Sequence, residues 1–155
     1  MKFHLITAAV IVAADFITKL LVRMNMQFGA TIPIVDDVFH ITHVGNTGAA
    51  FGIFPGSRWI LIALSLIIII GFIYVIVTRK FDDKWMRFGI AFMLGGAIGN
   101  LIDRLFIGHV VDFLDFRLIN FPVFNIADIF VTVGAGMVIV YTVLTTIREA
   151  KNEKS

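Results

Sequence analysis

Five aspartates of this chain lie where an ordinary surface role does not account for them. They fall within or close to long apolar runs: Asp15, Asp103, Asp112, Asp115 and Asp128. An ionisable group inside a membrane span costs about 2.5–3.5 kcal/mol on insertion scales, so it usually faces the protein interior and has a partner or a function. These five carboxyls are therefore the first candidates for chemistry.

Asp112 and Asp128 form the pair best suited to catalysis. Both are expected near the same membrane face, Asp112 just beyond the third apolar run and Asp128 at the start of the fourth. Two carboxyls held close in a low-dielectric site share a proton and divide into an acid and a base, which can activate water against a peptide bond. The alternatives are a helix N-terminal charge at Asp128 and a loop acid at Asp112.

The other intramembrane polar residues admit structural and functional interpretations. Asp15 and Lys19 are four residues apart on one predicted helix face, which favours an intrahelical ion pair. Asn100 and Asp103 share one stripe of the third run, with Arg104 as a local counter-ion. They either hold helices together by hydrogen bonds or support a reactive site.

Other catalytic chemistries lack the necessary residues. The chain has no Cys, and its serines have no Gly-x-Ser-x-Gly setting. Its four histidines form no His-Glu-x-x-His motif, and alternation along a predicted strand places His40 and His43 on opposite faces. No nucleotide-binding loop is present. We therefore expect neither a metal nor a cofactor.

The composition predicts that these residues are positioned by membrane-spanning helices. Of 155 residues, 59% are apolar and only 15% are charged, against about 45–50% and 25% in ordinary globular domains. Such a chain has room for at most about four or five spans, and hence a single integral membrane domain over residues 1–155. A net charge of +2, with bases only in small flanking groups, argues against a nucleic-acid partner.

Four apolar runs predict an all-α bundle of four transmembrane helices, at about residues 5–22, 59–77, 85–106 and 126–147. Gly95, Gly96 and Gly99 in the third run are expected to allow close helix packing. Between the first two runs, Thr31–Val35 and Val38–Thr42 are rich in β-branched residues and flank a predicted turn. These segments predict a small extracytoplasmic β element.

The distribution of basic residues predicts the orientation. Eight bases lie on the side of the two termini and four on the opposite side. Because Lys and Arg favour the cytoplasmic side, both termini should be cytoplasmic and Asp112 and Asp128 should lie near the extracytoplasmic face. The first run has the alternative of being a cleaved signal peptide, but no convincing small-x-small cleavage site follows it.

Five strings, taken together and in order, are similar to lipoprotein signal peptidase, the type II signal peptidase of bacteria. The resemblance covers nearly the whole chain. The strings are Asp15-Phe16-Ile17-Thr18-Lys19, Asn46-Thr47-Gly48-Ala49-Ala50-Phe51-Gly52, Gly95-Gly96-Ala97-Ile98-Gly99-Asn100-Leu101-Ile102-Asp103-Arg104, Val110-Val111-Asp112-Phe113 and Phe124-Asn125-Ile126-Ala127-Asp128.

This resemblance implies an aspartic endopeptidase of the bacterial cytoplasmic membrane, with Asp112 and Asp128 as the catalytic pair. The implied substrate is a prolipoprotein with a diacylglyceryl-modified cysteine, cut just before that cysteine, and no obligatory protein partner is evident. Gly45 departs from the pattern, because many relatives have a larger residue there. The family's supporting polar residues correspond to Asp15, Asn46, Asn100, Asp103, Arg104 and Asn125.

Two other classes compete with the peptidase interpretation. A small proton- or cation-coupled transporter would use intramembrane Asp15, Asp103 and Asp128 as a relay, and a structural subunit would use them only to hold helices together. The transporter predicts acids spread through the membrane depth. The peptidase predicts acids gathered at one face.

Overall fold

The computed structural model describes residues 2–48, 56–78 and 83–152. Residues 49–55 lie outside this range, and 49–52 are the last four residues of the second string above. The bases Arg79, Lys80 and Lys154 also lie outside it. The elements in chain order are α1 (Lys2–Asn25), β1 (Thr31–Val35), β2 (Phe39–Asn46), α2 (Arg58–Thr78), α3 (Lys84–Phe106), β3 (Val110–Phe116), the short 3-10 helix η2 (Arg117–Ile119) and α4 (Ile126–Asn152).

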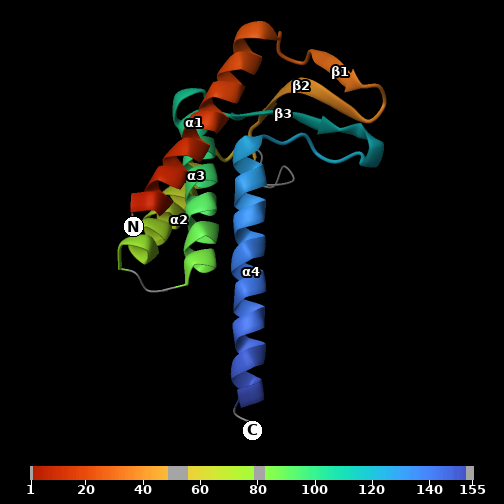
Figure 1. Ribbon diagram of the computed structural model, residues 1–155. Helices are drawn as coiled ribbons and strands as arrows, with labels where there is room; N and C mark the ends of the chain where they lie inside the picture. Colours follow the sequence, from red (N-terminus) through yellow and green to blue (C-terminus); the bar gives the residue numbers. More distant parts are fainter. Residues whose placement is uncertain (1, 49–55, 79–82, 153–155) are drawn as a thin grey trace.

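Four helices are long and apolar enough to cross a membrane, which confirms the predicted spans. Each helix contains one predicted run. Helices α2 and α3 match their runs to within one residue at each end, whereas α1 extends three residues beyond both ends of its run and α4 continues five residues further, to Asn152. Polar residues continue these helices past the hydrocarbon core, where water and headgroups replace lipid chains. The sheet lies at one end of the bundle, and both termini point away from it (Figure 1).

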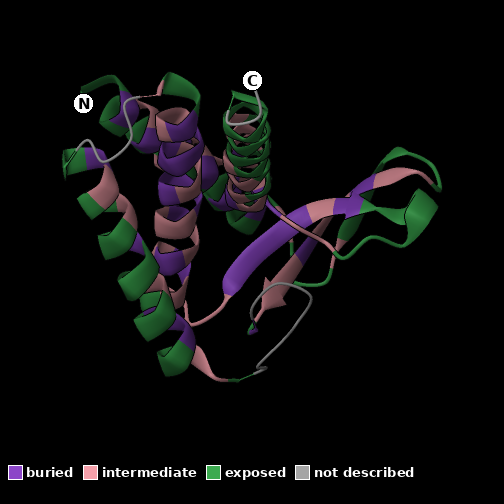
Figure 2. Ribbon diagram, turned by 90° about the horizontal axis from the view of Figure 1, so that it is seen from below, coloured by how far each residue is buried: buried purple, intermediate pink, exposed green. Residues whose placement is uncertain are grey.

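Helix α3 is the centre of the bundle and packs against each of the other three helices. Half of its apolar stretch is buried inside the protein, against 11–28% in the other helices. Buried residues follow α3 and the inner strands, whereas the outward helix faces are exposed (Figure 2). The exposed side chains include many large apolar ones, such as Ile67, Ile70 and Val140, as expected for faces in contact with lipid.

Glycines on α3 allow two helices to approach closely on different sides. A Cβ on Gly95 would lie 2.8 Å from the Ile11 Cβ of α1, and one on Gly96 would collide with the Ala127 carbonyl oxygen of α4. The predicted role of these small residues in helix packing is thereby confirmed.

The two predicted strands are present, and a third strand joins them. Strand β1 has the predicted bounds, whereas β2 continues four residues beyond its predicted end to Asn46. The sheet order is β1-β2-β3, all antiparallel. Strand β3 follows α3 in a connection for which no strand was predicted. It places Asp112 opposite Val44, so the β element draws on both connections at this end of the bundle.

Candidate active site

Asp112 and Asp128 are placed by two different elements that meet beneath the sheet. Asp112 lies in the middle of β3 with only 1% of its surface exposed, and Asp128 lies in the first turn of α4 and is half-buried. Their neighbours Val111 and Ala127 are completely buried, so both backbones are fixed by packing. The catalytic candidates thus come from segments that only the folded chain brings together.

Asn125 caps α4 and connects the two aspartates. Its side-chain Oδ1 accepts a hydrogen bond from the Asp128 backbone N–H at 2.9 Å, while Asp128 Oδ2 accepts from the Asn125 backbone N–H at 3.2 Å. This reciprocal arrangement is a capping box in which Asp takes the usual place of Glu. The Asn125 Nδ2 donates to Asp112 Oδ1 at 2.6 Å. The helix-terminus interpretation of Asp128 is therefore correct, and it coexists with a link to Asp112.

Amide groups, rather than cations, satisfy the buried Asp112 carboxyl. Asn46 at the end of β2 donates from Nδ2 to Asp112 Oδ2 at 3.1 Å, and Asn125 donates to the other oxygen. Asn100 of α3 donates from Nδ2 to Asp128 Oδ1 at 2.8 Å. Its own Oδ1 accepts from Asn125 Nδ2 at 3.1 Å. Three asparagines from three elements thus hold the aspartate pair.

Asp15 and Asp103 anchor the backbone immediately before each of the two candidate residues. Asp103 Oδ2 accepts from the Val111 N–H at 2.9 Å, one residue before Asp112. Asp15 Oδ1 accepts from the Ala127 N–H at 2.9 Å, one residue before Asp128. These two intramembrane carboxylates therefore fix the strand and the helix turn on which Asp112 and Asp128 are carried.

Lys19 joins these two anchors, and its position was not among the predicted site residues. Its Nζ lies 2.7 Å from Asp15 Oδ2, 3.1 Å from Asp103 Oδ2 and 2.9 Å from Asn100 Oδ1. The predicted Asp15–Lys19 ion pair is confirmed. The partners on α3 were not foreseen, although a buried lysine inside a span is itself a signal for a functional cluster.

Arg104 is oriented toward the backbone rather than toward Asp103. Its Nη2 donates to the Gly48 carbonyl at 2.9 Å, and its Nη1 donates to the Asn100 carbonyl at 3.3 Å. Within the described residues, the ion-pair partner of Asp103 is Lys19 and not the predicted Arg104. Arg104 thereby ties Gly48, two residues after Asn46 at the end of β2, to α3.

Asp115 does not join this cluster. It lies at the far part of β3, where its Oδ2 accepts from Thr42 Oγ1 at 2.6 Å and from Arg117 Nε at 3.0 Å. Burial alone would raise the pKa of Asp115, but these hydrogen bonds and the Arg117 charge outweigh it and hold that pKa below its usual value. Four of the five aspartates singled out by the sequence therefore converge, and the fifth stabilises the sheet.

The electrostatics of Asp112 suit proton transfer near neutral pH. Burial in the protein, followed by repulsion from the nearby Asp128 charge, raises the pKa of Asp112 to about 7 despite the hydrogen bonds from Asn46 and Asn125. A carboxyl with such a pKa exchanges its proton readily at physiological pH.

The structure explains the unusual Gly45. A Cβ at this position of β2 would lie 2.6 Å from the His109 ring and 3.1 Å from the Phe28 ring. Phe28 and His109 are themselves in edge-to-face contact, with ring centroids 6.1 Å apart. The two rings occupy the volume that a larger side chain would need.

Among residues 2–48, 56–78 and 83–152, no three His, Asp or Glu side chains are grouped as ligands for a metal ion. The cluster itself presents carboxyl, amide and ammonium groups.

Four spanning helices around a buried carboxyl cluster define a polytopic membrane enzyme, and solved structures have the same fold. A bacterial membrane enzyme determined by the in meso method at 2.3 Å superposes with a TM-score of 0.89 and 31% identity, over 94% of this chain and 90% of that one. A second, at 1.9 Å, gives a TM-score of 0.83 at the same identity, over 92% and 93% of the two chains.

The chain belongs to the signal peptidase II family, and so to the peptidases. The family model for signal peptidase (SPase) II matches residues 7–144. The lipoprotein signal peptidase of Brevibacillus brevis is 45% identical over 90% of this chain and 93% of its own length. Those of Desulfitobacterium hafniense and Clostridioides difficile are 42% and 41% identical, over 96% and 89% of this chain and 97% and 93% of their own lengths.

Proposed function

We propose that this protein is an aspartic endopeptidase of the bacterial cytoplasmic membrane that removes signal peptides from diacylglyceryl-modified prolipoproteins, cutting just before the lipidated cysteine. Membership of the signal peptidase II family supports signal-peptide removal from prolipoproteins. The single observation that carries the catalytic assignment is the convergence of Asp112 and Asp128, linked through Asn125, on a buried polar cluster at one end of the spans.

In the proposed mechanism the two carboxyls share one proton. Asp112 is the more buried carboxyl and has its pKa raised to about 7, which suits it to carry the shared proton and to act as the acid. Asp128, half-buried and facing the amide of Asn100, acts as the base. A water attacks the scissile carbonyl carbon while it gives a proton to Asp128, and Asp112 donates its proton to the carbonyl oxygen.

The second half of the reaction returns both protons. Collapse of the tetrahedral diol breaks the carbon–nitrogen bond as Asp128 protonates the leaving amine, and the hydroxyl that Asp112 had protonated gives its proton back. The products are the signal peptide with a new carboxyl end and the lipoprotein with a free amine on its lipidated cysteine. The pair ends with one proton, ready for another cycle.

The surrounding residues are proposed to position the pair and the substrate. Asp15, Asp103 and Lys19 fix the two backbones, as described above, which is the preorganisation that such a site needs. Asn46 is half-buried at the end of β2, from which its amide can also donate to the substrate backbone. Arg104 secures the residues that follow Asn46.

The gathering of the acids favours the peptidase over a transporter. A proton relay needs groups spaced through the membrane depth. Here Asp15, Asp103, Asp112 and Asp128 form one network joined by Lys19 and the asparagines. No single file of acids leads from this network toward the terminal side within the described residues.

Product analysis with a lipid-matched pair of substrates tests the proposed substrate. The purified protein is reconstituted with one prolipoprotein, either diacylglyceryl-modified or unmodified, and the products are identified by mass spectrometry. We expect a new amino terminus at the lipidated cysteine and no cleavage of the unmodified form. Cleavage elsewhere, or equal cleavage of both forms, would contradict the proposal.

A further inference from the structure

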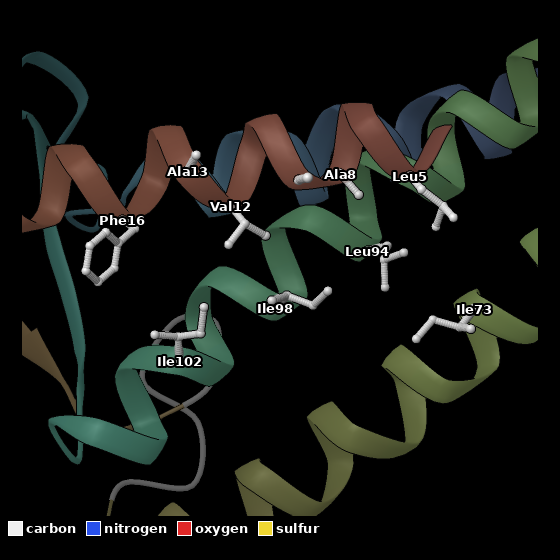
Figure 3. Close-up of a pocket in the computed structure, with 10 residues that line it drawn as sticks. Leu5, Ala8, Val12, Ala13, Phe16, Ile73, Leu94, Ile98 and Ile102 are labelled. Carbon is white, nitrogen blue, oxygen red and sulfur yellow. The ribbon is translucent and has the colours of Figure 1, made fainter. Parts of the chain in front are cut away.

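An apolar groove runs along the outside of the bundle, away from the asparagines that hold Asp112 and Asp128. Its cavity measures about 460 Å³ and lies between α1, α3 and α2. The side chains of Val12 and Phe16 from α1 and of Ile98 from α3 line it, with Ile73 of α2 on the far side (Figure 3). A cavity of this volume is within the range of small-ligand sites.

A second cavity of about 140 Å³ continues the groove toward the sheet end of the bundle. The two cavities share Phe16 and Ile102 in their linings, so they are parts of one groove. The second cavity differs in chemistry because Lys19, Arg23 and Asp103 also line it. The groove is therefore amphipathic, with an apolar length and a charged end.

At this end of the groove, Arg23 is the charged residue whose N–H donors have no partner among the described residues. Lys19 and Asp103 pair with each other at 3.1 Å, and each has further bonds within the buried cluster. The Arg23 guanidinium is exposed, and it has neither an ion pair nor a hydrogen bond to any other described residue. The charged end thus presents to a ligand a cation that has no partner among the residues that the structure describes.

The part of the groove nearest the sheet matches one leaflet of a bilayer in length, and the groove continues beyond it along α1 to Leu5. From Arg23 down to Val12, α1 rises through 11 residues, or about 16 Å. The hydrocarbon core is about 30 Å thick, so this length is close to one half of it. An amphiphile with its headgroup at Arg23 would therefore lay its acyl chain past Phe16 as far as Val12 and Ala13.

We propose that this groove binds an anionic phospholipid from the leaflet on the sheet side of the membrane. Its phosphate pairs with Arg23, and one acyl chain lies in the apolar groove between α1 and α3. A bilayer phospholipid fits both ends of the groove, because its tail needs no polar partner and its phosphate needs a cation. The inference does not depend on the proposed catalytic function, since it concerns binding alone.

Lipid retention measured by native mass spectrometry tests this proposal. The protein is equilibrated in nanodiscs with equal amounts of phosphatidylglycerol and phosphatidylcholine. We expect retention of phosphatidylglycerol to exceed that of phosphatidylcholine by about fivefold, the effect of one basic residue near a membrane surface. Arg23→Gln should bring the ratio close to one. Ala13→Phe, which fills the groove, should reduce the retention of both lipids.

Two matched variants control for charge and bulk. Arg148→Gln removes a cation from the exposed end of α4, and Val10→Phe places the same aromatic side chain on an exposed face of α1 outside the groove. Both should retain lipid as the wild type does, and far-UV circular dichroism should show that all four variants stay helical.

Three results would overturn the proposal. The first is an unchanged lipid ratio in Arg23→Gln, and the second is equal loss of lipid in Val10→Phe and Ala13→Phe. The third is displacement of the bound lipid by a competitor. If inorganic phosphate displaced it, the site would be a phosphate site. If a diacylglyceryl-modified peptide displaced it, the groove would belong to the substrate. Retention in the presence of both competitors is the expected result.

Discussion

At the scale of single residues, the buried Asp112 carboxyl is held by neutral amides, while Lys19 neutralises the acids that anchor its strand. Asp112 accepts from Asn46 and Asn125, and Lys19 pairs with Asp15 and Asp103. This division leaves Asp112 with a raised pKa. The cation of the cluster holds the supporting residues in place and makes no ion pair with the proposed catalytic carboxyls within the described residues.

Asp112 should make the fold less stable as pH rises. Its pKa is raised to about 7 in the folded protein from 3.8 for an unperturbed aspartate, so the folded state binds the proton more tightly. Its contribution is fully present below pH 3.8 and is lost as pH rises through 7, at up to about 1.4 kcal/mol per pH unit. Asp112→Asn should abolish this slope, which chemical denaturation in detergent between pH 5 and 8 can measure. Parallel slopes in the two proteins would argue against a raised pKa.

Removing Lys19 should destabilise the protein strongly. Lys19→Met leaves the Asp15 and Asp103 carboxylates buried without a cation, and breaking a buried ion pair in this way typically costs about 3–5 kcal/mol. The double variant Lys19→Met/Asp15→Asn removes one of the stranded charges and should recover part of the loss. Thermal unfolding of purified protein provides the comparison. Identical midpoints for wild type and Lys19→Met would show that the cluster does not contribute to stability.

Residue types and their spacing indicated most of this cluster, since four of the five selected aspartates converge in the structure. Lys19 was the exception. The sequence shows only its local partner Asp15, whereas its contact with Asn100 joins residues 81 positions apart. Local periodicity carries no information on such a distant contact. The only signal for these distant partners in the sequence was the free-energy cost of placing a lysine inside a span.

At the scale of elements, the site depends on how closely α4 approaches α3. The N-terminal turn of α4 carries Asp128, and its Ala127 carbonyl lies directly against Gly96. Gly89 and Gly134 make a similar close approach farther along the same pair, where a Cβ on Gly134 would lie 2.5 Å from the Gly89 carbonyl oxygen. Small residues on α3 thereby set the position of the aspartate on α4.

Gly96→Ala should therefore impair both stability and activity. The added methyl group forces α4 outward, and such overpacking typically costs about 1–3 kcal/mol. Gly136→Ala in α4 is the matched control, because its Cβ would meet no other atom within 4 Å and alanine favours the helix. We expect lower cleavage rates and a lower unfolding midpoint only for Gly96→Ala. Equal behaviour of the two variants would contradict this account.

The spans and β1 could be predicted because each has a clear local pattern, a long apolar run or β-branched residues beside a turn. Strand β3 could not. Its sequence, Val110–Phe116, is short and interrupted by two aspartates, and it becomes a strand by pairing with β2 from a distant connection. The same pairing with β3 extends β2 to Asn46. One cause therefore explains both why β3 was not predicted and why the predicted length of β2 was too short.

At the scale of the whole molecule, the sheet lies at the end of the bundle opposite both termini (Figure 1). Asp112 in β3 and Asp128 in the first turn of α4 belong to this end. Many large apolar side chains face outward along the helices, so the surrounding lipid completes the surface that the protein leaves uncovered. The distribution of bases predicts that the terminal side is cytoplasmic and that the sheet lies on the opposite side. This orientation would bring the cluster to substrates that have already been exported.

Labelling single cysteines tests this orientation without background, because the natural chain has no Cys. Ile34→Cys is exposed on β1, and Asn152→Cys is exposed at the end of α4. In intact bacterial cells with a permeabilised outer envelope, a membrane-impermeant maleimide should label position 34. It should label position 152 only after the cytoplasmic membrane is opened. The reverse pattern would invert the topology and place the cluster at the cytoplasmic face.

The central claim is that Asp112 and Asp128 act together as the catalytic pair. The most direct measurement is the cleavage rate of a diacylglyceryl-modified prolipoprotein by Asp112→Asn and Asp128→Asn, with Asp115→Asn from the same strand as the control. Asparagine keeps the size of aspartate but cannot exchange the proton. The account predicts a loss of at least about 100-fold for each of the first two variants. Asp115→Asn, if it folds, should retain most of its activity. Near-wild-type cleavage by a folded Asp112→Asn or Asp128→Asn protein would contradict the account.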